Sequence, residues 1–271
     1  MNKILKYIII ALPITAFTTI NNTSKSIQPL PVDVCAFKNT TFKNGEKLIY
    51  KAFYSVSGIY VAAGELELST KLTKYLNKPV YQVTGNAKTL SSYDFIFKVR
   101  DVYTSYLDTA TLFPVRFERD VQEGNYTNKQ KATFKQAEKK IITDKETYKT
   151  NSCTLDVISA LYACRNIDIS KYKTGDKITF NMYIDEEQFS MYVKYMGKEK
   201  VNTKFGSYNA IKLRPMLIKG NVFNGGEGMT MWVTDDKNHI PVRIESPIKV
   251  GGVKIDLMSS SGLLNPMTAK L

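Results

Sequence analysis

One phrase occurs twice in this chain, and it constrains the fold more than any other feature of the sequence. Residues 106–118 read YLDTATLFPVRFE, and residues 233–245 read VTDDKNHIPVRIE. In each copy an Asp can open a turn, and a Pro, which fixes φ and lacks an N–H, begins the returning strand. A Gly-acid-Lys-apolar sequence lies at a similar distance before each copy, starting at Gly45 and at Gly175. The repeat indicates two related β units; independent hairpins with the same pattern are the alternative.

Strand-like alternation of apolar and polar side chains runs through most of the chain. It is clear in residues 48–56 and 178–195, where the acidic residues 185–187 are typical of a hairpin turn. Residues 59–63 are apolar on both parities, which predicts burial on both faces. The polar, Lys-rich residues 125–140 predict an exposed hairpin arm or a sheet edge.

One segment has helical character instead. Residues 154–165, TLDVISALYACR, offer Thr154 or Ser152 as an N-cap and place Arg165 near the negative end of a helix. Most sides of this helix are apolar, so we expect it to be buried. We therefore predict a mainly β protein in which a strongly curved antiparallel sheet or half-barrel, built from two related β units, wraps around one buried helix.

The N-terminus has the pattern of a secretory signal peptide. Lys3 and Lys6 precede an apolar stretch that is shorter than the ~20 residues of a membrane span. We expect cleavage after Ala16 or Thr18, with an uncleaved anchor as the alternative, and export of a soluble mature protein to the periplasm or the extracellular space. The expected organisation is a signal peptide over 1–18, an extended lead-in over 19–41, a single β-rich domain over 42–262 with β units at 42–145 and 175–258, and a tail over 263–271.

The chain has three cysteines, which are too few for a disulfide framework. Along a helix, at 1.5 Å per residue, Cys153 and Cys164 would lie about 16 Å apart, beyond disulfide reach. A disulfide must then include Cys35. We expect Cys35 to pair with Cys153 and Cys164 to remain a small buried thiol.

The formal net charge is +13, which favours attraction to anionic surfaces. For an exported protein those anions are lipid headgroups, anionic glycans and acidic partner proteins, and we expect no nucleic-acid partner. The lysines are dispersed along the chain, so a solvated basic surface is the simpler interpretation.

No motif in the sequence names a reaction. His239 is the only histidine and lies in a turn-like sequence, and the chain lacks a G-x-S-x-G elbow, zinc-ligand spacings and a calcium loop. We therefore predict no catalytic residue, no metal and no cofactor. A carboxylate-based glycan hydrolase remains an alternative, because paired acids need few sequence constraints. Its candidate acids are Glu65, Glu67, Asp94, Asp101, Glu118, Glu227 and Glu245.

Two of these acids, Glu118 and Glu245, each follow an Arg by two residues on the same face of a strand. A structural ion pair is the simpler interpretation of that spacing. The aromatic residues 91–97 around Asp94 are interpreted as a corner of the core rather than as a platform for a sugar.

Several motifs occur in an order that resembles a known family. They are Phe42-x-x-Gly45-Glu46, Ala63-Gly64-Glu65, Asp156-Val157-Ile158-Ser159-Ala160-Leu161-Tyr162, Gly175-Asp176-Lys177, Tyr195-x-Gly197-x-Glu199 and Trp232-Val233-Thr234-Asp235-Asp236. Over residues 42–257 the chain resembles the domain of unknown function 3108, found in exported bacterial proteins. The resemblance implies export and a mainly β fold, similar to the curved sheet of periplasmic lipoprotein carriers, and it supplies no catalytic residues.

These observations predict a noncatalytic envelope protein that binds a hydrophobic or amphiphilic ligand, such as a lipid, in its curved sheet. If the apolar side chains of the second unit pack solidly against the helix, they form only a core. The alternatives are a scaffold or assembly factor that binds another envelope protein, and the glycan hydrolase. The residues predicted to bind the ligand are Met182, Phe189, Met191, Met229, Met231 and Trp232.

Overall fold

The computed structural model describes residues 37–56, 59–218, 225–248 and 251–271, and in these residues fifteen strands form one sheet. The strand order is β8-β7-β6-β5-β4-β3-β2-β1-β15-β14-β13-β12-β11-β10-β9. The strands are β1 (Lys47–Val56), β2 (Ile59–Tyr75), β3 (Lys78–Thr89), β4 (Val99–Asp108), β5 (Pro114–Glu123), β6 (Tyr126–Lys135), β7 (Lys140–Thr143), β8 (Thr147–Lys149), β9 (Thr154–Leu155), β10 (Lys177–Ile184), β11 (Glu187–Thr203), β12 (Gly206–Pro215), β13 (Thr230–Thr234), β14 (Pro241–Pro247) and β15 (Gly252–Ser261).

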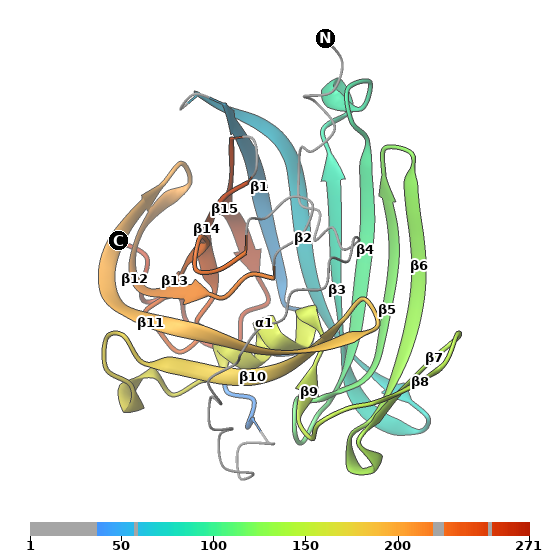
Figure 1. Cartoon of the computed structure of the whole chain (residues 1–271). Coiled ribbons are helices and arrows are strands. Elements are labelled where there is room, and N and C mark those ends of the chain that lie inside the picture. The colour runs from blue at the N-terminus through green and yellow to red at the C-terminus, as the bar shows by residue number, and fades with distance from the viewer. Residues whose placement is uncertain (1–36, 57–58, 219–224, 249–250) are drawn as a thin grey trace.

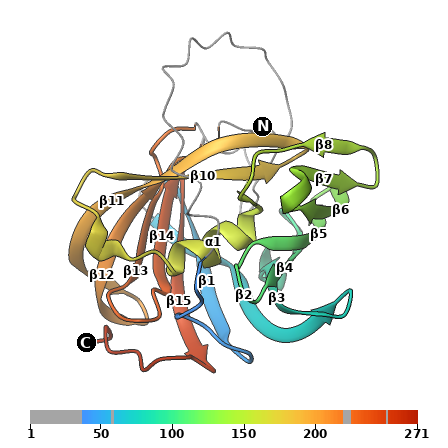
Figure 2. The ribbon, with the colours of Figure 1, turned by 90° about the horizontal axis from the view of Figure 1, so that it is seen from below.

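The sheet curves around a single α-helix, α1 (Val157–Arg165), as Figures 1 and 2 show. Neighbouring strands are antiparallel except for β9, which pairs in parallel with β10. The predicted mainly β fold, with a curved antiparallel sheet around one buried helix, is confirmed. The predicted signal peptide, most of the lead-in and Cys35 lie outside the described residues, so the Cys35–Cys153 disulfide stays a prediction. Among the residues described, no helix has the length and apolar character needed to cross a bilayer.

The sheet contains two meanders of the same topology, β1–β6 and β10–β15. The second strand of each, β2 and β11, has 17 residues. The first strand of one meander pairs with the last strand of the other, β1 with β15. The predicted pair of related β units therefore corresponds to two six-stranded units joined head to tail.

The repeated phrase forms the β4–β5 hairpin in one unit and the β13–β14 hairpin in the other. Each hairpin has a register shift just before its turn. In each, the residue two positions before the Pro is left-handed: Leu112 has φ 60 and His239 has φ 45. A positive φ is uncommon for residues other than Gly, so its recurrence at the same place supports a common origin of the two units.

Helix α1 begins later than the sequence pattern predicts. Thr154 and Leu155 pair with β10 instead of entering the helix, and neither Thr154 nor Ser152 is the N-cap. Asp156 is the N-cap: its Oδ1 accepts from the backbone N–H groups of Ile158 and Ser159, at 2.8 and 2.9 Å. The Ser159 hydroxyl accepts from the Asp156 N–H at 2.7 Å, which completes a capping box.

The helix connects the separate parts of the core. Ile158 and Tyr162 pack with Phe42 and Val83 in one cluster. Ala160 and Ala163 pack in a second cluster that includes β10 and β11. The predicted burial of the helix is confirmed, because side chains on most of its sides are covered.

The antiparallel order of the first unit defines two ends of the molecule. The β2–β3 and β4–β5 turns lie at the end where α1 is found, called here the helix end (Figure 1). The β1–β2, β3–β4 and β5–β6 connections lie at the opposite end, called here the rim end. The distinction matters because the helix covers the sheet at one end only.

Side chains near the two edges of the sheet link them, and no backbone ladder joins the outermost strands β8 and β9. The Gln136 side chain accepts from the Thr154 N–H at 3.2 Å and donates to the Thr154 carbonyl at 2.8 Å. The Asn151 N–H donates to Gln188 Oε1 at 2.8 Å, and Lys145 Nζ lies 2.7 Å from Glu186 Oε1. The sheet is therefore curved but not closed.

Three local predictions are wrong. Residues 125–140 are not an exposed arm or edge: β6 lies between β5 and β7, and its Ala132 and Phe134 are buried. Lysines on the other parity had hidden this buried stripe in the sequence. Residues 59–61, predicted to be buried on both faces, are exposed, and Phe95 in the predicted core corner is 85% exposed. All of these exposed residues lie at the rim end, beyond the reach of the helix.

Candidate functional site on the helix-facing side of the sheet

The six residues predicted to bind a ligand lie in different surroundings. Met182 and Met191 are buried in the cluster that includes Ala160 and Ala163 of α1, and Phe189 packs against the same cluster. These side chains fill space against the helix. They are therefore core residues in the described structure.

The other three predicted residues lie around β13. Met231 belongs to a separate cluster on β10–β13, and Met229 is half-buried just before the strand. Trp232 points to the opposite face from its neighbour Met231. Its Nε1 donates to Glu199 Oε1 at 2.7 Å, and Lys212 Nζ lies 5.5 Å from its ring centroid. The six residues thus do not converge on one cavity.

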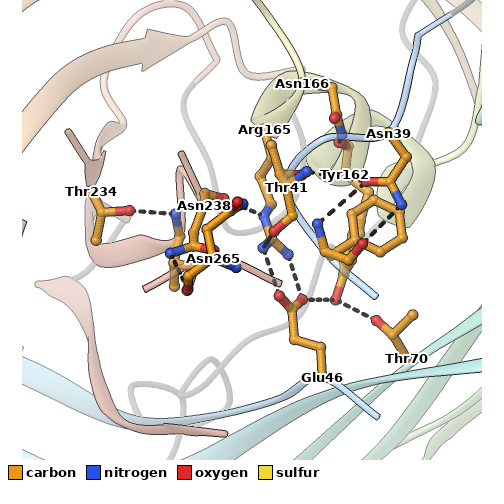
Figure 3. A network of polar contacts seen from close by, with 12 residues as sticks. Asn39, Thr41, Glu46, Thr70, Tyr162, Arg165, Asn166, Thr234, Asn238 and Asn265 are labelled. Atoms are coloured by element: carbon orange, nitrogen blue, oxygen red, sulfur yellow. Dashed lines mark hydrogen bonds and ion pairs between the residues drawn. The ribbon is translucent and has the colours of Figure 1, made fainter. Parts of the chain in front are cut away.

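A buried ion pair fixes the helix end (Figure 3). Arg165 Nη1 and Nη2 lie 2.6 and 2.8 Å from the two carboxylate oxygens of Glu46, a bidentate contact. The side chains of both residues are almost fully covered. Arg165 also donates to the Asn238 carbonyl at 3.1 Å and to the Thr41 carbonyl at 3.2 Å. One guanidinium therefore joins the helix to two other segments of the chain, the one before β1 and the β13–β14 turn.

His239 belongs to the same structural anchor. Its Nδ1 lies 2.6 Å from the Arg165 carbonyl, and the residue is half-buried rather than a fully solvated turn residue. The ring thus contacts the last turn of α1. This position gives the histidine a role in holding the helix.

Six of the seven acids considered for catalysis are held by cations, as expected for structural ion pairs. Asp101 differs, because no cation lies in ion-pair contact with it in the described residues. The pairs are Glu65 with Lys51, Glu67 with Lys47, Asp94 with Arg100, Glu118 with Arg116, Glu227 with Lys194, and Glu245 with Arg243.

Asp101 pairs instead with a second acid, Glu123. The β4–β5 register places Asp101 opposite Val121 and Glu123 opposite Val99, so both carboxyl groups lie on the same face. Ser105 lies four residues from Asp101 on β4 and therefore points to the same face. Its hydroxyl donates to Asp156, the N-cap of α1, at 2.6 Å, so this is the face that α1 covers.

The environment favours a protonated state of the acid pair. Burial raises the pKa of Asp101 to about 7, and burial together with the nearby Asp101 charge raises the pKa of Glu123 to about 8. In the described structure Asp101 Oδ2 and Glu123 Oε1 are buried, and neither accepts a hydrogen bond from another group. A side-chain hydrogen bond between the two carboxyl groups contributes to the shifts of both pKa values. The two groups therefore titrate as a pair.

A small cavity lies between β4–β6, the start of α1 and the β10–β11 turn, and neither acid of the pair lines it. It encloses about 10 Å³, the space of about one water molecule. Arg119 Nη1 lies 2.6 Å from Asp185 Oδ1 at this cavity, which ties β5 to the β10–β11 turn. Burial raises the Asp185 pKa to about 6. The lining residues are Tyr103, Phe117, Arg119, Gln130, Val157, Tyr183, Ile184 and Asp185.

Sequence reasoning missed Glu123, Arg119 and Asp185. Glu123 and Arg119 have the same parity on β5 as the buried Val121, a position where charged side chains are uncommon. Charged residues at core-facing positions of a strand could therefore have identified Glu123 and Arg119 from the sequence. The role of Asp185 as a turn residue concealed its second role, because only the fold brings the turn to β5.

An apolar stripe on β1 and β2 continues beyond the helix toward the rim end. Leu48, Tyr50 and Ala52 share one parity on β1 and are buried. The register places Val61 opposite the next residue of that parity, Tyr54. Val61 is 42% exposed, and Ile59, two residues further toward the rim end, is 71% exposed. The helix-facing side therefore presents uncovered apolar surface at the rim end.

Comparisons with known proteins extend the picture of the fold. The family model described as "Protein of unknown function (DUF3108)" matches residues 50–258. No curated protein matches the chain in sequence. A β-barrel-like protein of domain of unknown function DUF1849 from Brucella abortus has a similar fold, with 9% identity, a TM-score of 0.54, and coverage of 82% of this chain and 99% of that chain.

A second solved structure, named as a putative lipoprotein from Parabacteroides distasonis, is more distant. It has 13% identity and a TM-score of 0.37, and the match covers 84% of this chain and 99% of that chain. The Brucella protein supports the curved β architecture alone, because 9% identity carries no information about function.

Proposed function

The chain belongs to the DUF3108 family of proteins of unknown function, and we propose that it is a noncatalytic exported protein that holds a hydrophobic or amphiphilic ligand. The observation that carries the proposal is the uncovered apolar stripe at the rim end. Val61 and Ile59 continue the buried row of β1 and β2 but are left exposed on the helix-facing side. Burial of exposed apolar surface by a ligand is favourable by roughly 25 cal/mol per Å².

The proposed site differs from the one expected from sequence. We now place the ligand on the apolar stripe of β1 and β2. The Met side chains of β10 and β11, where the sequence placed it, already pack against α1. The acid pair lies on the same side of the sheet, on β4 and β5, two and three strands from β2. A ligand with an apolar chain and a polar end suits such a surface.

Native mass spectrometry of the exported protein, gently extracted from its own envelope, tests this proposal. We expect an adduct that organic solvent removes and that Val61→Asp abolishes. Val102→Asp is the matched control, because Val102 is 39% exposed but lies on the opposite face of the sheet, with the other parity from Asp101. A bare protein mass in the wild type, or equal loss in both variants, contradicts the proposal.

One observation favours a second candidate, the glycan hydrolase. Asp101 and Glu123 form a carboxyl pair with raised pKa values, as an acid catalyst requires. Against this, Asp101 is only 1% exposed, and the small cavity on β4–β6 has room for about one water and is not lined by either acid. Turnover of envelope polysaccharide that Glu123→Gln abolishes would promote this candidate; we expect none.

A further inference from the structure

The connections at the rim end of the first unit carry exposed apolar side chains. Ile59 and Tyr60 follow the β1–β2 turn, Phe95 lies in the β3–β4 connection, and Tyr126 follows the β5–β6 turn. These four residues, called here the rim set, are exposed by 71%, 40%, 85% and 43%. Three successive connections at the same end thus present apolar or aromatic groups to solvent.

The helix end of the same unit is built differently. Its β4–β5 turn also contains apolar residues, Leu112 and Phe113, but both are buried. Leu76 in the β2–β3 turn is the exception, with 73% exposure. The concentration of exposed aromatic rings at one end is the kind of surface that marks an interaction site.

The charges near the rim set favour an anionic partner. Lys98 is exposed three residues after Phe95, and Lys254 Nζ lies 3.5 Å from the centroid of the Tyr60 ring. Neither lysine forms an ion pair within the described residues. Of the nearby acids, Asp94 pairs with Arg100 and Asp120 pairs with Lys129, while Glu123, opposite Tyr126 in the β5–β6 hairpin, is half-buried with a raised pKa. The unpaired charge at the rim end is therefore positive.

From this arrangement we propose that the rim set docks the protein on the surface of an anionic lipid bilayer. Aromatic and aliphatic groups enter the boundary between headgroups and acyl chains, while lysines contact the headgroups. The net charge of +13, two units of which belong to Lys3 and Lys6 of the predicted signal peptide, favours the same encounter over long range. This inference rests on the proposed function, because a protein that carries an amphiphile must contact the membrane that supplies it.

Co-sedimentation with vesicles tests the docking surface. We expect the exported protein to bind phosphatidylglycerol-containing vesicles more tightly than pure phosphatidylcholine vesicles, and added salt to weaken the binding. The double variant Phe95→Ser/Tyr126→Ser should bind anionic vesicles at least about tenfold more weakly, since each ring loses apolar burial. Both residues are exposed, so the fold should be retained.

Leu76→Ser is the matched control, because Leu76 is exposed to a similar degree as the rim set but lies at the helix end. It should leave vesicle binding unchanged. Equal weakening by Leu76→Ser, or no binding of the wild type to anionic vesicles, overturns the proposal. Native mass spectrometry of the wild type separates the two ideas: an amphiphile adduct without binding to anionic vesicles overturns the docking surface and leaves the proposed function intact.

Discussion

At the scale of single residues, Arg165 shows how this fold uses a buried charge. Its guanidinium contacts Glu46 in a bidentate pair and donates to two backbone carbonyls, and almost none of it is exposed. A buried charge left without its partner is costly. The Glu46–Arg165 pair should therefore be required for the stability of the helix end.

We expect Glu46→Gln to lower the free energy of unfolding by about 3–5 kcal/mol, because Arg165 would remain buried without a counter-charge. Urea unfolding measures the loss. Lys47→Gln is the control: Lys47 pairs with Glu67, but both side chains are substantially exposed. Its loss should be at most about 1 kcal/mol. Similar losses in the two variants would contradict the structural role given to the buried pair.

The Asp101–Glu123 pair predicts that the free energy of unfolding depends on pH with the opposite sign to that expected from most carboxyl groups, whose folded pKa values are lowered. Both folded pKa values, about 7 and about 8, lie above the ordinary values of 3.8 and 4.5. The folded state therefore binds more protons than the unfolded state between pH ~4 and pH ~8, and the free energy of unfolding falls as pH rises through this window. The slope is at most about 1.4 kcal/mol per pH unit for each proton.

Urea unfolding of the wild type and of Glu123→Gln at several pH values across this window checks the prediction. The variant should have a shallower slope, because Gln cannot lose a proton and can donate to Asp101. Asp185 and Asp156 titrate in both proteins, so the difference between the two slopes isolates the pair. Parallel slopes would show that Glu123 is ionised in the folded protein at neutral pH.

Residue types alone could predict some of these contacts. The spacing Arg-x-Glu indicated the Arg116–Glu118 and Arg243–Glu245 pairs, and both are present. The pairing of Glu46 with Arg165 could not be predicted, because the two residues are far apart in the chain and only the position of the helix brings them together. The same holds for Arg119 and Asp185.

At the scale of elements, the start of α1 depends on one side chain. Asp156 accepts from two helix N–H groups and from the Ser105 hydroxyl, all in a buried setting. The sequence pattern located the helix but not its first residue. Thr154 and Leu155, the first two residues of the predicted helix, instead complete the edge of the sheet beside β10.

Asp156→Ala should lower the free energy of unfolding by about 2 kcal/mol or more, since it removes an N-cap and leaves the Ser105 hydroxyl without its acceptor. Thermal or urea unfolding gives the value. Asp168→Ala removes the cap of the exposed one-turn helix η4 (Ile169–Lys171) and should cost no more than about 0.5 kcal/mol. An equal cost at the two caps would argue against the anchoring role of Asp156.

The edges of the sheet offer a second prediction at this scale. Gln136 bonds both backbone groups of Thr154, so Gln136→Ala should free β9 locally. Hydrogen exchange should then speed up at β9 and the first turn of α1, while β1–β3 stay protected. Unchanged exchange at β9 would mean that its pairing with β10 holds this edge without help from Gln136.

At the scale of the whole molecule, the repeated phrase predicted the architecture because its copies mark equivalent hairpins of two meanders. Periodicity could not predict which apolar side chains a ligand might use. Met182 and Val61 are both apolar strand residues. Met182 is buried against α1, whereas Val61 lies beyond the helix and is 42% exposed. The position and length of the helix decide between core and surface, and these follow from the whole fold.

The central claim is that an amphiphile occupies the helix-facing side of β1 and β2 at the rim end. Photo-cross-linking with a diazirine-bearing fatty acid, followed by peptide mapping, tests it most directly. Labels should fall on Tyr54, Ile59 and Val61, and excess unlabelled fatty acid should suppress them. Labels on Val102 or Trp232 in place of these residues, or labelling that the competitor does not reduce, would contradict the account.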